Sequence, residues 1–470
     1  MPGLVPGIHA FLFRRQGVDG RDKPGHDKSE GSLMVEVRTI KTPAEQALSA
    51  AYESARGKLP GGKAVAALRE DAFRRFDAQG LPHRRVEEWK YTDLRALMRD
   101  AVPLAPPPDA AAKQAAKDAG RLFSAIHARR LVFADGALVP ELSDLTPEPG
   151  LTLGSLAAAL ANGDALVAAH VGKTVETDDV AVALNTSLMG DGAVIHLAAG
   201  TALKRPIELV FASGGDKPSS AFIRSLVVVE KGAKLILIES HEGGASQVNA
   251  ALELIVGDGA TVDYIKTTQT HGLHVGSLLA AIGAYAAFNS FAFNADAALV
   301  RNQMFVRFAG EGTKAGIRGV SLARGKDHID TTLLIDHAAG HCESREQFRS
   351  VLDGESRGIF QGKIVVRPHA QKTDAKMMTR ALLLSEEAEA DNKPELEIFA
   401  DDVVCGHGAT TAAPSEELKF YLMSRGIPEA EAEALLVQAF VGEAIEEIAH
   451  EGIREALMFA ALKWLGTRGR

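Results

Sequence analysis

The sequence predicts a mainly β protein whose core is a β-solenoid with helical segments on both sides of it. From about residue 150 onwards, short apolar runs follow one another, and Gly, Asp, Lys and Ser separate them. No amphipathic helix of ordinary length appears there, which disfavours a sheet built from βαβ units. The runs include residues 193–197, 207–211, 226–229, 235–238, 252–256 and 262–265.

A weak internal repeat indicates which β fold this is. Segments that begin at Gly232, Gly259 and Gly283 each open with Gly-Ala and lead into a β-like run. Repeats of roughly 20–50 residues are typical of solenoids and propellers, and a four-stranded propeller blade needs a longer repeat than this one. A β-helix, in which each turn pairs with the next and inward side chains stack into one core, fits the spacing. An antiparallel sandwich remains the alternative, because periodicity alone does not separate the two.

Helix signals bracket the β region. Thr42 and Glu45 form a capping box around Pro43, and an Ala-rich helix follows. Near the other end of the chain, Ser415 is the expected N-cap of a helix that closes at Gly426, and two further helical patterns come after it. The expected organisation is an N-terminal helical region with a Pro-rich linker over residues 34–149, the β-helix core over 150–412, and a C-terminal helical domain over 413–470.

Residues 1–33 do not share this organisation. The segment has no hydrophobic period and is rich in Gly, Pro and charged residues. We expect it to be disordered or a translated upstream extension, with Met34 as the natural start. N-terminal mass spectrometry of the native protein tests this expectation.

Composition excludes several classes of protein. The formal net charge of −9 at pH 7 argues against a general nucleic-acid binder, which needs a positive field. No run approaches the ~20 apolar residues of a membrane-spanning helix. Only two cysteines are present, Cys342 and Cys405, so neither a disulfide framework nor a four-cysteine cluster site can form within one chain. This usage indicates a reduced, cytoplasmic protein.

One short spacing suggests a metal or cluster site. Cys405 and His407 are two residues apart, so on a strand both side chains face the same side, with Cα atoms roughly 7 Å apart. A thiolate and an imidazole placed in this way can both reach one metal ion or cluster. The spacing alone favours a plainer interpretation, a buried Cys and a hydrogen-bonded His at the end of a strand.

Other motifs carry less. Residues 57–64 almost match a phosphate-binding loop, but Ala64 stands where Ser or Thr must ligate Mg²⁺, and we interpret the segment as a turn between helices. Asp327 with Asp330, and Asp401 with Asp402, resemble the paired carboxylates of β-helix polysaccharide lyases, although most such residues belong to turns. The histidines of the β region are scattered without metal-ligand spacing; they are His271, His274, His328, His337 and His341.

A family resemblance rests on much longer motifs. Residues 393–410 read KPELEIFADDVVCGHGAT, and residues 420–427 read FYLMSRGI. Together they resemble, almost without a break, the C-terminal signature of the SufB/SufD family of iron–sulfur cluster assembly proteins. Residues 87–94, EEWKYTDL, are similar to an N-terminal element of the SufD branch, and residues 340–344 and 372–374 also fit the family's β-helix portion. The resemblance covers the chain from about Met34 onwards.

The resemblance implies a fold and a set of partners. The fold is a right-handed parallel β-helix with helices at both ends, in a non-catalytic assembly subunit. The chain would pair with a SufB-like paralogue, and possible self-pairing as a homodimer is implied for the isolated chain. A transient iron–sulfur cluster, or iron, would be held at the SufB interface near His407 and Cys405. The C-terminal helices would dock a SufC-like ABC-type ATPase through Phe420, Tyr421, Leu422, Arg425 and Gly426. A flavin is possible in the family but no sequence feature supports it.

Two other functions stay open. The chain can be a purely structural subunit that bridges SufB to the ATPase, with no ligand role for Cys405 or His407. A β-helix carbohydrate-active enzyme is the alternative from another class, and it predicts an exposed groove with clustered carboxylates or arginines. The scarcity of cysteines favours the SufD branch over SufB, which would carry more of them, including a sulfur-accepting one in the β-helix.

Overall fold

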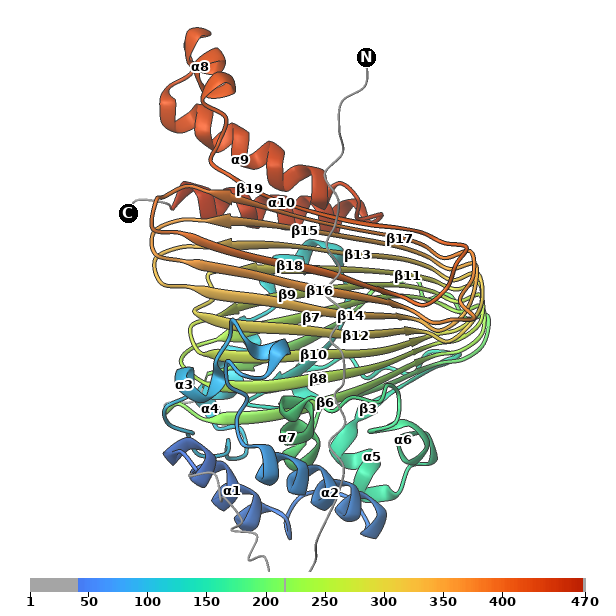
Figure 1. The fold of residues 1–470 in the computed structure, drawn as a ribbon. Helices are drawn as coiled ribbons and strands as arrows, with labels where there is room; N and C mark the ends of the chain where they lie inside the picture. Colours follow the sequence, from blue (N-terminus) through green and yellow to red (C-terminus); the bar gives the residue numbers. More distant parts are fainter. Residues whose placement is uncertain (1–40, 215–216, 468–470) are drawn as a thin grey trace, which may run out of the picture. The chain divides into compact units, whose positions relative to one another are not determined.

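The chain forms a parallel β-helix, and the two sheets of this β-helix enclose one apolar lumen (Figure 1). The computed structural model describes residues 41–214 and 217–467, so the leader expected over residues 1–33 lies outside the described residues. The described part contains a solenoid of about seven turns. From β5 (Ile207–Ser213) onwards, successive strands alternate between the two sheets and pair in parallel with their neighbours, so the predicted parallel β-helix is confirmed and the antiparallel sandwich is wrong.

The strands fall into two sets. The ten-stranded sheet has the order β19-β17-β15-β13-β11-β9-β7-β5-β1-β2, and the nine-stranded sheet has the order β18-β16-β14-β12-β10-β8-β6-β4-β3. The first set is β1 (Arg129–Ala134), β2 (Ala137–Leu138), β5 (Ile207–Ser213), β7 (Lys234–Gly243), β9 (Thr261–Thr270), β11 (Ala287–Ala295), β13 (Lys314–Ala323), β15 (Glu343–Leu352), β17 (Asp374–Leu383) and β19 (Val404–Ala412). The second set is β3 (Leu151–Ser155), β4 (Ala193–Leu197), β6 (Ser220–Val229), β8 (Gln247–Val256), β10 (Leu273–Ile282), β12 (Leu299–Phe308), β14 (His328–His337), β16 (Arg357–Val366) and β18 (Glu389–Ile398).

Parallel, in-register pairing fixes which side chains face the lumen. Val262 pairs with Leu235 on one side and with Phe288 on the other. All three are buried in the same core cluster. Because side chains alternate across a strand and paired positions share a face, each inward position continues as a column from one turn to the next. The column to which a residue belongs therefore determines whether its side chain points into the lumen or outward.

The corners of the solenoid correct the repeat seen in the sequence. Gly232 and Gly259 adopt left-handed backbone angles, with φ of 68° and 66°, two residues before β7 and β9. The equivalent residue before β11 is Tyr285, with φ of 53°, and not Gly283. The sequence repeat was aligned on glycine identity, but what each corner needs is a left-handed residue, and Tyr285 takes that conformation. Its ring lies 72% exposed at the surface.

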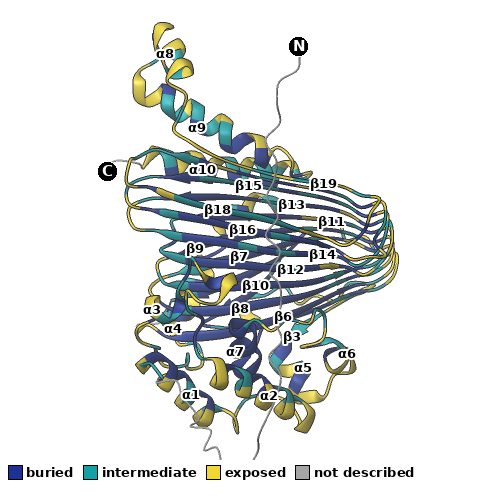
Figure 2. Cartoon of the chain, in the orientation of Figure 1, coloured by how far each residue is buried: buried dark blue, intermediate teal, exposed yellow. Residues whose placement is uncertain are grey.

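Helices pack on part of each outer face of the solenoid and gather toward its two ends (Figures 1 and 2). On the nine-stranded sheet, apolar residues of α1, α2 and α7 pack against Phe222 and Val275. On the ten-stranded sheet, α9 and α10 pack against Ile265, Phe291 and Val320. The capping box of Thr42 is present, and no helix in the described ranges is both long and apolar enough to cross a membrane. The helices are α1 (Pro43–Ala55), α2 (Lys63–Gln79), η1 (Glu87–Trp89), α3 (Leu94–Leu97), α4 (Ala110–Asp118), η2 (Arg121–Ile126), η3 (Pro140–Leu142), α5 (Leu156–Asn162), α6 (Ala165–His170), α7 (Val180–Leu188), α8 (Glu416–Ser424), α9 (Glu429–Ile445) and α10 (Glu451–Gly466).

A strap of residues 82–98 ties the N-terminal helices to the nine-stranded sheet. Trp89 is buried under the guanidinium of Arg301, whose Cζ lies 4.1 Å from the ring centroid, and its indole Nε1 donates to Asp179 at 2.9 Å. Arg301 also forms an ion pair with Asp330, and both side chains are at most 1% exposed. The hydroxyl of Thr92 donates to the same carboxylate. The aromatic and charged residues of the EEWKYTDL segment therefore anchor the strap to the solenoid.

We expect Asp330→Ala to lower the free energy of unfolding by about 3–5 kcal/mol, because it leaves the buried Arg301 without its counter-charge. The exposed pair of Lys326 and Glu355, with side chains 82% and 66% exposed, provides the control. Glu355→Ala should cost less than about 1 kcal/mol. Chemical denaturation followed by circular dichroism measures both, and equal effects would contradict the anchoring role of Asp330.

Candidate functional site

The solenoid ends in an open turn formed by β18 and β19. In the described structure, β18 pairs only with β16 and β19 only with β17, so each leaves one edge unpaired. Burial falls at this end, since no residue of β18 or β19 is fully buried. The inward columns of the lumen therefore come to the surface here, at what we call the lumen mouth.

Cys405 and His407 lie at the lumen mouth. In the register of β17 and β19, Cys405 pairs with Ala375 and His407 with Met377. Ala375 and Met377 are 0% and 2% exposed and belong to the lumen core, so Cys405 and His407 continue two inward columns. Cys405 is half-buried and packs against that core, whereas His407 is exposed. The structure thus places both side chains on the lumen-facing side of β19, in the last turn of the solenoid.

The electrostatics at the mouth favour a neutral thiol until a cation arrives. Burial raises the pKa of Cys405, and the negative charges of Asp374 and Glu346 add to that effect, while a backbone hydrogen bond to Ala375 opposes it. A metal cation would reverse this balance by stabilising the thiolate. Among the described residues, no three His, Cys, Asp or Glu side chains are close enough to hold a metal ion together. Cys405 and His407 can therefore supply only part of a ligand set.

Three polar side chains, those of Glu346, Ser344 and His337, lie inside the lumen below the mouth. Of these, only His337 was a candidate from the sequence. Glu346 is 0% exposed, and neither carboxylate oxygen has a hydrogen-bond partner among the described residues. Burial raises its pKa to about 7, against the lowering effects of Ser344, Arg345 and Arg318. The imidazole Nε2 of His337 lies 3.1 Å from the Ser344 hydroxyl. The alternation of Ser344 and Glu346 on one strand face was the available signal, but the sequence does not show which face is inward.

A second buried polar cluster lies deeper in the solenoid. The carboxylate of Glu239 accepts from Tyr264 at 2.7 Å and contacts the imidazole of His241 at 2.5 Å. Burial lowers the pKa values of His241, Lys266 and His274. All of these side chains are at least nine-tenths buried and lie several turns from the mouth. The cluster is an internal network remote from the open end.

The remaining candidates of the sequence have structural roles. Residues 57–62 form the predicted turn between α1 and α2, and residues 63 and 64 begin α2. Asp327 accepts from the backbone of Arg324 in a corner, Asp330 binds Arg301, and Asp402 forms an ion pair with Lys372. These carboxylates are engaged in separate contacts and do not converge on a common groove.

Comparison with known proteins assigns the family. Residues 43–209 match the family model described as the SufBD protein N-terminal region, and residues 211–440 match that of the SUF system FeS cluster assembly SufBD core domain. The chain is 32% identical over 385 residues to an iron–sulfur cluster assembly SufBD family protein of Synechocystis, which covers 78% of this chain and 84% of that protein. It is 30% identical over 389 residues to the iron–sulfur cluster assembly protein SufD of Escherichia coli, covering 81% and 88%.

The chain belongs to the SufB/SufD family. It is a SufD-family iron–sulfur cluster assembly protein, and the resemblance seen in its C-terminal motifs is confirmed. A SufD of Bacillus subtilis is more distant, at 26% identity over 59% of this chain. The family is one of assembly subunits, and the arrangement at the lumen mouth is understood below in that context.

The second predicted site of this SufD-family protein lies on α8. This helix contains no fully buried residue. Phe420 is 73% exposed and Tyr421 53% exposed, Leu422 is half-buried, and the Arg425 guanidinium lies 5.1 Å from the Tyr421 ring centroid. Gly426 closes the helix with φ of 88°. Exposed aromatic side chains on one short helix are typical of a protein-binding surface.

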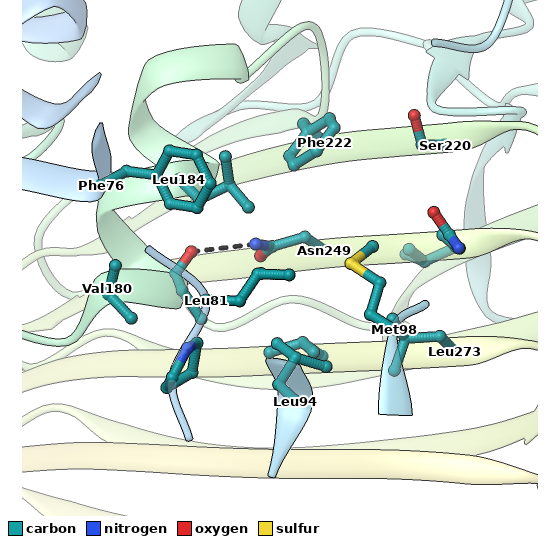
Figure 3. Close-up of a pocket in the computed structure, with 15 residues that line it drawn as sticks. Phe76, Leu81, Leu94, Met98, Val180, Leu184, Ser220, Phe222, Asn249 and Leu273 are labelled. Carbon is teal, nitrogen blue, oxygen red and sulfur yellow. Dashed lines mark hydrogen bonds between the residues drawn. The ribbon is translucent and has the colours of Figure 1, made fainter. Parts of the chain in front are cut away.

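A mostly apolar cavity lies away from both places (Figure 3). It has a volume of about 20 Å³ between the strap, α7 and the outer face of β6, β8 and β10, lined by side chains such as Phe76, Leu94 and Phe222. Two of its polar donors are already used, because Asn249 Nδ2 donates to the Ala181 carbonyl and Ser220 to that of Val102, while Asn249 Oδ1 has no partner among the described residues. A dry space that holds about one water molecule is a packing defect rather than a ligand site.

We expect Glu346→Gln to stabilise the protein above pH 7. Glu346 has a folded pKa of about 7 against an ordinary value of 4.5, so its ionisation costs folding free energy that grows from pH 4.5 to pH 7 and is constant above. The variant should gain on the order of 3 kcal/mol at pH 8 and almost nothing near pH 4.5. Urea denaturation at several pH values measures this. A gain that does not depend on pH would contradict a buried, unpartnered carboxylate.

Proposed function

We propose that this chain acts as the SufD-like subunit of a cluster-assembly complex. A SufB-like paralogue pairs with its open end, and a SufC-like ABC-type ATPase docks on its C-terminal helices. The iron–sulfur cluster, or iron on its way to one, is the cargo, held transiently where the two β-helices meet. The observation that carries this proposal is the position of Cys405 and His407, an incomplete ligand set beside an unpaired strand edge.

Of the two unpaired edges, β19 is the better partner for another strand. Edge strands that must not pair are protected by proline and by charge. β18 contains Pro394 together with Lys393 and Glu395, whereas β19 contains no proline and no Asp, Glu, Lys or Arg. Pairing along β19 places a partner strand directly beside Cys405 and His407. The partner then supplies the ligands that this chain lacks.

The contacts of α9 provide a route from the ATPase to the mouth. Arg349 on β15 forms an ion pair with Glu443, and Arg318 on β13 forms one with Glu447 at 3.1 Å. Arg349 also donates to the backbone carbonyl of Phe440. A partner that moves α8 and α9 would therefore also exert a force on β13 and β15, the strands below the lumen mouth. A displacement of these strands at the interface with the SufB-like partner would let iron and sulfide reach Cys405 and His407.

The alternatives to this proposal are a purely structural bridge and a carbohydrate-active enzyme. A purely structural bridge uses the same partners but gives Cys405 and His407 no role. A carbohydrate-active enzyme needs converging carboxylates, and the candidate aspartates form separate structural contacts. Pairing of two copies along β19 is the corresponding expectation for the isolated chain. No residue set in the described structure argues for a flavin.

We expect His407→Ala to lower the cluster yield roughly tenfold or more while the complex still assembles. Loss of a ligand should cost at least as much metal affinity as loss of a supporting residue does. The chain is co-expressed with its SufB-like and SufC-like neighbours, and cluster absorbance is measured after anaerobic reconstitution. Cys405→Ala is measured in parallel. An unchanged yield in both variants leaves only the structural bridge, and loss of the complex makes His407 structural.

We expect Phe420→Ala to weaken binding of the ATPase roughly thirtyfold, corresponding to about 2 kcal/mol for a central aromatic contact. The matched control is Tyr285→Asn, which removes an equally exposed aromatic ring from a corner that a left-handed Asn tolerates. Calorimetric titration with the purified SufC-like ATPase measures both. Equal affinities for the Phe420 variant and the wild type would remove α8 from the interface.

A further inference from the structure

Glu346 is a buried charged group near the lumen mouth that neither packing nor hydrogen bonding explains within the described residues. In the described structure it is 0% exposed and both of its oxygens lack a partner. The side chains directly below and above it in the same inward column are Ile317 and Met377, both buried and apolar. A carboxylate in such surroundings is costly to bury. Strongly perturbed titratable groups cluster at functional sites.

The register places Glu346 directly beneath the proposed ligands. Its column continues through Met377 to His407, two strand spacings away, or about 10 Å between Cα atoms. Met377 lies between Glu346 and His407 in this column, and its unbranched side chain does not fill the space between the two residues. Its thioether reaches across the lumen to Gly362, where an added Cβ would lie 2.4 Å from the sulfur. The negative charge of Glu346 also acts on the thiol of Cys405.

We propose that Glu346 is the interior carboxylate that draws ferrous iron to the lumen mouth and holds it beside Cys405 and His407. The inference rests on the proposed function, and it adds a residue and a cargo class to that site. Glu346 acts as a positioning residue through its charge, since no direct ligation by it follows from the geometry. A charge in a poorly solvated interior acts over such a distance with little screening by salt. The opposite effect applies to sulfide, which the same charge repels until iron is bound.

The same strand offers a matched control. Glu343 is three residues earlier on β15, faces outward, is 47% exposed and forms an ion pair with Lys314. Glu343→Gln and Glu346→Gln remove the same charge from one strand, one outside the lumen and one inside it. Glu346→Asp keeps the charge inside the lumen on a shorter side chain. Since Glu346→Gln is expected to stabilise the fold, weaker binding in that variant cannot come from unfolding.

The experiment is an anaerobic titration with Fe²⁺ at pH 8, on the full chain alone and in complex with its SufB-like partner. We expect Glu346→Gln to weaken Fe²⁺ binding on the order of a hundredfold, the size expected for one negative charge about 10 Å from a divalent cation at an effective dielectric constant of about 20. Glu343→Gln should bind as the wild type does. Glu346→Asp should retain affinity within roughly threefold of the wild type, because the charge and not the shape of the side chain matters.

The outcomes separate this inference from the proposed function. If Glu346→Gln binds Fe²⁺ as tightly as the wild type while Cys405→Ala and His407→Ala do not, Glu346 has no role and the site stands. An equal loss in Glu346→Gln and Glu346→Asp would make the residue structural, which also overturns the inference. If the wild type binds no Fe²⁺ in either form, or all variants bind equally, both the inference and the iron site at the mouth fail.

Discussion

In-register parallel pairing is the constraint on which the rest of this structure depends. Once one strand of the solenoid faces Leu235 inward, pairing fixes the direction of Val262, Phe288 and every later residue in that column. The same pairing extends the inward columns to the last turn. There Cys405 and His407 face the lumen because they pair with the inward residues Ala375 and Met377. The site is therefore a property of where the stack ends. Without a further turn above β19, residues that would otherwise be core become accessible.

The fold could be predicted from the sequence because its signals are local and repeated. Short apolar runs, helix caps such as Thr42 and Ser415, and the Gly-Ala repeat all correspond to elements of the structure. The repeat was misaligned at Tyr285, since a left-handed corner depends on backbone angles that residue identity does not fix. That Cys405 and His407 share one face of a strand also followed from their spacing of two residues. Glu346 could not be found, because its burial depends on the register of β15 against strands about 30 residues away.

The lumen of this SufD-family protein contains buried polar groups among its apolar side chains. Glu239 deep in the stack is satisfied by Tyr264 and His241, so its charge is accounted for within the chain. Glu346 near the mouth is not satisfied in this way. A buried carboxylate without a partner is destabilising, and the position of Glu346 near the open end agrees with the role proposed for that end. From outside the solenoid, α9 contacts the same part of the ten-stranded sheet through ion pairs with Arg318 and Arg349.

The central claim is that β19 is the edge at which this chain meets its paralogue. Hydrogen exchange of the backbone amides, followed with and without the SufB-like partner, tests it most directly. The account predicts that amides of residues 404–412 become strongly protected in the complex, while those of β18 change little, because only β19 gains a paired strand. Protection confined to β18 or to the N-terminal helices, with β19 unchanged, would contradict it.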